Sequence, residues 1–152
     1  MLSVAERLNL PGVRIVWVSG DATLDRCGSI DWTNKLLIEE NTTDYFEPLR
    51  EMARESLKEV IGSSGDSEEG PDEASAAIAT SKLTENDHII SLQELLIVVM
   101  ALAACGTVWA GTVVVYAGDN MNVGRWLETR RSRSPLVRHI LAFLGCLESV
   151  HQ

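Results

Sequence analysis

The sequence predicts an α/β domain in which a mixed sheet, made of an antiparallel hairpin and a parallel strand, is flanked by helices. Two strand-like segments, residues 14–19 and 26–33, are separated by a short connection typical of a hairpin with its turn at Leu24-Asp25. A long apolar helical segment then precedes a β-branched run at residues 112–117. We expect that run to lie beside residues 14–19 and parallel to them, since a helix connects the two.

A further strand and a helix are predicted after the hairpin. Residues 35–39 form a candidate third strand. Asp44 and Glu47 stand at the spacing of a capping box, and Pro48 suits a first helical turn. The apolar residues of one face of this helix are Leu49, Met52, Ala53, Leu57, Val60 and Ile61.

The net charge of −9 is concentrated in one part of the chain. Residues 39–87 contain fourteen acidic and four basic residues, and residues 62–71 offer no apolar side chain to bury. We therefore expect one domain over residues 1–152, with residues 40–87 as an acidic, partly disordered insertion. This acidity excludes a general affinity for nucleic acid, but the arginines within residues 125–138 form a local basic strip.

The central helix and the segments after it follow from spacing and breaks. Its apolar residues recur at helical spacing: Leu92, Leu95, Leu96, Val99, Leu102 and Ala103. Cys105-Gly106 is predicted to end the helix, with residues 108–111 as a connection. Residues 112–117 are apolar on both faces, which is typical of a central parallel strand. A helix over residues 120–128, with Met121, Val123, Trp126 and Leu127 facing inward, and a last one beginning at Ser134-Pro135 complete the prediction.

The same apolar region leaves a membrane alternative open. Residues 95–118 carry no charge and reach the ~20 residues that a bilayer span requires. Several arginines follow directly, as the positive-inside rule would place them. No positively charged and then apolar leader opens the sequence, so we expect an intracellular location in the soluble interpretation.

Three acidic residues occupy corresponding places in the predicted fold. Asp21 follows the first strand, Asp119 follows the later parallel strand, and Glu94 is expected in the first turn of the intervening helix. Ligands bind at the carboxyl ends of strands in open α/β sheets, and converging carboxylates suit divalent cations such as Mg²⁺. Each acid also has a simpler interpretation: Asp21 as a turn residue, Asp119 as an N-cap and Glu94 as an acid favoured by the helix dipole.

Short motifs at these acids resemble those of the ribonuclease H domains of reverse-transcriptase retroelements, in the caulimovirus- and DIRS-like branch. Together they cover roughly residues 13–33 and 88–150. The similar segments are the hairpin motifs Asp21-Ala22-Thr23 and Cys27-Gly28-Ser29, the helix entry at residues 88–95, the strand end Val115-Tyr116-Ala117-Gly118-Asp119-Asn120 and the turn at residues 131–136.

The resemblance implies a ribonuclease H-like fold and hydrolysis of the RNA strand of RNA–DNA hybrids. It implies that Asp21, Glu94 and Asp119 are the catalytic residues and ligate Mg²⁺ (or Mn²⁺). The residues that it places against nucleic acid are Asn120, Arg130, Arg131, Arg133 and Ser134. The family's fourth carboxylate and last edge strand have no visible counterpart in this sequence. A shortened fold, and a catalytically degenerate binding or interaction module, therefore remain open as alternatives.

Overall fold

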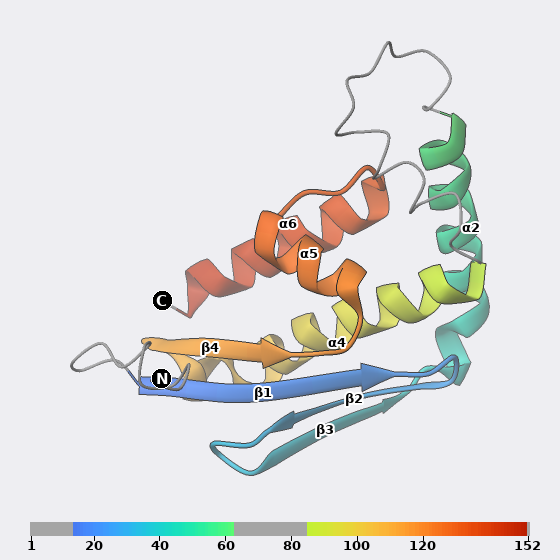
Figure 1. The fold of residues 1–152 in the computed structure, drawn as a ribbon. Helices are drawn as coiled ribbons and strands as arrows, with labels where there is room; N and C mark the ends of the chain where they lie inside the picture. The colour runs from blue at the N-terminus through green and yellow to red at the C-terminus, as the bar shows by residue number, and fades with distance from the viewer. Residues whose placement is uncertain (1–13, 63–84, 152) are drawn as a thin grey trace, which may run out of the picture.

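The computed structural model describes residues 14–62 and 85–151, which form a four-stranded sheet with helices against one face (Figure 1). The α/β class is thus confirmed; the predicted disorder of residues 62–71 falls almost wholly outside the described residues. The elements in chain order are β1 (Arg14–Ala22), β2 (Arg26–Asp31), β3 (Leu36–Asn41), η1 (Thr43–Tyr45), α2 (Phe46–Gly62), α4 (Glu85–Trp109), β4 (Thr112–Ala117), α5 (Met121–Thr129) and α6 (Pro135–Val150).

The sheet has the predicted mixture of strand directions. Its order is β3-β2-β1-β4, with β1 antiparallel to β2 and parallel to β4. β1 continues past the predicted end at residue 19 because Asp21 and Ala22 still pair with Gly28 and Cys27 of β2. β2 ends at Asp31, before the predicted limit at residue 33.

The connection after β2 fixes the start of the third strand. Asp31 Oδ1 accepts hydrogen bonds from the backbone N–H groups of Thr33 and Asn34, which turn the chain away from the sheet. Lys35 has a φ of 58°, a left-handed conformation that a strand residue does not adopt. For this reason β3 spans residues 36–41 rather than the predicted 35–39.

Helix α4 is the centre of the core because it is covered on both sides. Ile97 and Ala101 pack toward the sheet, and Leu92 packs toward the other helices. The cluster that joins α4 to the other helices consists of Leu49, Ala53, Ile89, Leu92, Leu95, Val123, Val137 and Leu141. Helix α2, which belongs to the acidic segment, is therefore part of this core. On α2, the predicted inward residue Met52 is half exposed, whereas Ser56 is buried.

The predicted end of the central helix is wrong by one turn. Cys105 and Gly106 lie inside α4, which ends at Trp109. A side chain at Gly106 would collide with the imidazole of His151, so this glycine allows the C-cap residue of α6 to approach. The chain reverses instead at Gly111, where φ is 66°. Trp109 Nε1 also ties the helix end to the sheet by donating to Asp31 Oδ2 at 2.7 Å.

Two glycines without close neighbours allow a test of the conclusion that the chain reverses at Gly111. A Cβ atom added at Gly111 or at Gly124 would have no other atom within 4 Å, so steric contact does not distinguish the two positions. We expect Gly111→Ala to lower the free energy of unfolding by about 1 kcal/mol, because alanine disfavours positive φ. Gly124→Ala, inside α5, should raise it by about 0.5–1 kcal/mol. Urea unfolding of both variants measures the two signs, and equal signs would contradict this assignment of the turn.

Strand β4 has the predicted bounds but not the predicted surroundings. It forms an edge of the sheet in the described residues, because β1 is its sole neighbour there. Val113 and Val114 are 40% and 39% exposed. The prediction of a central strand, made from apolar residues on both faces, is therefore wrong.

The run considered as a membrane span is divided between two elements. Residues up to Trp109 are helical, and Thr112–Ala117 pairs with β1 as a strand. Among the described residues, α4 alone is long and apolar enough to cross a bilayer. More than half of its most apolar window is buried inside the fold.

The last two helices begin at residues that cap them. Asn120 Oδ1 accepts hydrogen bonds from the backbone N–H groups of Asn122 and Val123 and thereby starts α5. Val123 is buried as predicted, whereas Met121 is exposed in the first turn. Ser134 caps α6 ahead of Pro135, which confirms the predicted start of that helix.

Candidate metal centre

Asp21, Glu94 and Asp119 lie together at one end of the sheet. β1 and β4 run in the same direction, so their carboxyl ends meet on the side where α4 begins (Figure 1). One carboxylate oxygen from each residue can be chosen so that the three atoms lie within 4.8 Å of one another. The strand order predicted from sequence thus brings together three acids that are far apart in the chain.

The simpler interpretation of each acid does not fit its position. Asp21 lies within β1 and not in a turn. Glu94 is in the third turn of α4, which begins at Glu85, so it is not a first-turn acid placed by the helix dipole. Asn120, not Asp119, is the N-cap of α5. Local helix or turn geometry therefore does not account for the three carboxylates.

Glu94 is the one acid of the three whose negative charge is buried. Its side chain is almost fully buried, whereas Asp21 and Asp119 are exposed. Burial and the negative charges of Asp119 and Asp21 raise the pKa of Glu94 to about 7, although the side-chain amide of Asn120 partly offsets these effects. Its Oε2 atom is buried without a hydrogen-bond partner among the described residues.

A short polar chain holds the surroundings of Glu94 in place. Asn120 Nδ2 donates to Ser91 Oγ at 2.9 Å, and the Ser91 hydroxyl donates to the carbonyl of Asp87 at 2.8 Å. The amide of Asn120 thus joins the start of α5 to the first turns of α4. Its oxygen caps α5 and its nitrogen bonds Ser91, so Asn120 helps to shape the site, and its contact with nucleic acid stays a prediction.

The residues present fit a divalent cation. Oxygen atoms that share one Mg²⁺ lie at most about 4.2 Å apart, twice the usual ~2.1 Å bond. The observed 4.8 Å limit is close to that value and suits ligands around one or two ions. The ion pairs that the structure shows within residues 14–62 and 85–151 do not include these acids. The three carboxylates offer oxygen acceptors alone, which is the kind of ligand that such a cation prefers.

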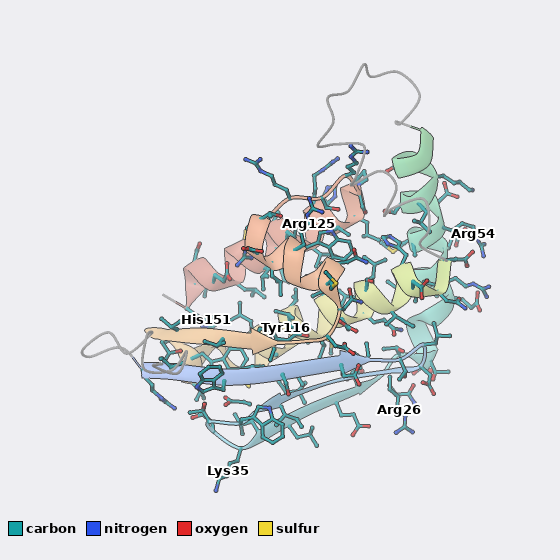
Figure 2. The ribbon with its side chains drawn as sticks, in the orientation of Figure 1. Arg26, Lys35, Arg54, Tyr116, Arg125 and His151 are labelled. Carbon is teal, nitrogen blue, oxygen red and sulfur yellow. The ribbon has the colours of Figure 1, made fainter. Side chains whose placement is uncertain are left out.

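The residues predicted to contact nucleic acid differ in their exposure and in their contacts. Arg130 Nη2 pairs with Glu148 Oε1 at 2.6 Å, and Arg130 is also the left-handed C-cap of α5. Ser134 is buried, caps α6 and shares a hydrogen bond with Ser56, so its hydroxyl is not presented to solvent. Arg131 and Arg133 are exposed in the turn between α5 and α6. The neighbouring Arg125 lies at this helical side of the molecule, away from the sheet (Figure 2).

A depression of about 320 Å³ adjoins the site on the hairpin side. It begins at Asp21 and runs across β1 and β2 toward Leu37 and Glu39 of β3. Gly20 and Gly28 contribute backbone without side chains to its floor.

Sequence reasoning missed one side chain at this end of the sheet. Tyr116 of β4 has a buried hydroxyl close enough to the three acids for their charges to raise its pKa, after the larger effect of burial. A signal was present in the sequence, because the dipeptides Gly20-Asp21 and Gly118-Asp119 repeat at the ends of both parallel strands.

Comparisons of the chain with protein-family models, with curated proteins and with solved structures found no match.

Proposed function

We propose that this chain is a metal-dependent nuclease of the ribonuclease H type, which hydrolyses the RNA strand of RNA–DNA hybrids. The observation that carries the proposal is the convergence of one carboxylate oxygen each from Asp21, Glu94 and Asp119 to within 4.8 Å, with Glu94 buried. The strand order β3-β2-β1-β4 and the sequence resemblance support the substrate and the reaction class. They do so by analogy of arrangement, since a fold alone does not define a function.

The roles of the residues follow from their positions. Asp21, Glu94 and Asp119 would hold Mg²⁺ or Mn²⁺, and such ions supply an activated water and neutralise charge at the scissile phosphate. Glu94, whose pKa is raised to about 7, would release its remaining proton as the ion binds. Arg130, Arg131 and Arg133, which are all exposed, are the candidates for phosphate contacts, which position a backbone without reading its sequence.

The test uses the full chain and a hybrid whose RNA strand carries a fluorescent label. We expect cleavage of that strand in the presence of Mg²⁺ and none with excess EDTA. A DNA duplex and an RNA duplex of the same sequence are the substrate controls. Failure of the wild-type chain to cleave the hybrid above the EDTA background would remove the enzymatic proposal. Binding of the hybrid without turnover, weakening steeply with salt, would instead identify the degenerate binding module.

A further inference from the structure

The ring of Tyr116 occupies a space that two glycines leave open. Tyr116, which Figure 2 labels on β4, pairs with Val18 of β1. It packs against the core between the sheet and the helices, with its ring close to Gly20. A Cβ atom at Gly20 would lie 2.7 Å from Tyr116 Oη, and one at Gly118 would lie 3.0 Å from Cε1 of the same ring. The first distance is too short for a side chain unless the tyrosine shifts, and the second is tighter than most contacts of real Cβ atoms, so both glycines make room for the tyrosine.

These glycines tie the tyrosine to the candidate metal centre. Gly20 directly precedes Asp21, and Gly118 directly precedes Asp119. The tyrosine hydroxyl therefore lies beneath the backbone that carries two of the three acids. The third acid, Glu94, exerts the largest effect of any charge on the pKa of Tyr116, which burial and the three carboxylates together raise.

Two complementary polar atoms are left without partners in this corner. Tyr116 Oη and Glu94 Oε2 are both buried, and neither has a hydrogen-bond partner among the described residues. A phenol donates and a carboxylate accepts, and leaving either group unsatisfied costs about 1–3 kcal/mol. Tyr116 Oη lies against Gly20 and Gly118, and Glu94 lies against the acids that directly follow these glycines. Since the two atoms do not bond each other directly, one group placed between them would satisfy both. Buried water commonly has this role between otherwise unsatisfied polar groups.

We propose that Tyr116 is a positioning residue of the carboxylate site, whose hydroxyl donates through one ordered water molecule to Glu94 Oε2. This bond fixes the carboxylate of Glu94 so that its other oxygen faces Asp21 and Asp119. The inference rests on the proposed function in one respect, namely that Glu94 is a metal ligand. A tyrosine that only fills space would be replaced by phenylalanine without effect at the site.

The first test is the Tyr116→Phe variant, which removes only the hydroxyl oxygen. We expect its affinity for Mn²⁺, measured by isothermal titration calorimetry at pH 7.5, to fall about tenfold, as for other losses of support behind a metal ligand. Val114→Ala is the matched control: Val114 is on the same strand and the same face and lines the same groove beside α5 and α6 as Tyr116, but it is two residues further from Asp119. It should lower the melting temperature and leave the Mn²⁺ affinity unchanged. Unchanged affinity in Tyr116→Phe would overturn the inference.

A second variant displaces the hydroxyl without removing it. Gly20→Ala introduces a methyl group at the position that lies 2.7 Å from Tyr116 Oη. We expect it to weaken Mn²⁺ binding about as much as Tyr116→Phe, and the double variant to be little worse than either single one. Additive losses would show that Gly20 acts through Asp21 independently of the tyrosine, contrary to the inference.

A metal-free crystal structure separates this inference from the proposed function. An ordered water within hydrogen-bond distance of both Tyr116 Oη and Glu94 Oε2 is the expected result. A tyrosine hydroxyl bonded elsewhere would overturn the inference even if the wild-type chain binds Mn²⁺. If the wild-type chain binds no Mn²⁺, the metal centre is lost from the proposed function, and the crystal structure still decides the role of Tyr116.

Discussion

The Glu94→Gln protein should be more stable than the wild type at pH 8 in the absence of divalent cations, by about 3 kcal/mol in the free energy of unfolding. The ordinary pKa of a glutamate is 4.5, and burial together with Asp119 and Asp21 raises the pKa of Glu94 to about 7 in the folded protein. Ionisation of Glu94 therefore opposes folding, and glutamine occupies the same space without ionising.

Because the pKa of Glu94 is raised in the folded protein, the free energy of unfolding of the wild type depends on pH. Below pH 4.5 Glu94 is neutral in both the folded and the unfolded chain, so its favourable contribution is fully present. Between pH 4.5 and about 7 the unfolded chain releases the proton while the folded protein retains it, and that contribution is lost as pH rises. The advantage of Glu94→Gln should therefore grow across this interval and level off above it.

Urea unfolding at pH 4, 6 and 8 in EDTA measures the effect. Glu128→Gln makes the same chemical change at an exposed position of α5 and is the matched control. A stability difference between Glu94→Gln and wild type that stays constant from pH 4 to pH 8 would contradict the electrostatic account. Saturating Mg²⁺ should reverse the order of stability at pH 8, because a cation that binds only the folded wild type stabilises it.

The parts of the fold that sequence could predict are those set by neighbouring residues. The β-branched run at Thr112–Ala117 defines β4 within its own length, and Ser134-Pro135 defines the start of α6. The position of the site could be predicted from one feature of the topology: parallel pairing of β1 with β4 brings Asp21 and Asp119 to the same end of the sheet.

The parts that could not be predicted depend on residues distant in sequence. Gly106 looked like a helix end, but the contact with His151 gives that glycine its role, and the reversal occurs at Gly111. The exposure of Val113 follows from the strand order, because the described residues place no strand beyond β4. Ser134 was expected to face nucleic acid, yet α2 supplies Ser56 as its buried partner.

Replacing Asp119 by Asn should reduce Mg²⁺-dependent cleavage of the hybrid by about 10³-fold, if the proposed function holds. Asparagine retains the shape of the side chain but removes the charge that would hold the cation and, with it, several kcal/mol of stabilisation at the scissile phosphate. Asp119 is exposed and is not the cap of α5, so the variant should remain folded. The comparison is therefore between equally folded proteins.

Single-turnover cleavage by wild type, Asp119→Asn and the surface control Glu128→Gln measures this loss, with circular dichroism as the check on folding. Asp21→Asn should lose a similar factor, and the Asp21→Asn, Asp119→Asn double variant should be hardly worse than either, because residues that hold the same ions act as a unit. Cleavage by Asp119→Asn at the wild-type rate would place the activity outside this cluster. A loss shared by Glu128→Gln would point to net charge instead of ligation as the cause.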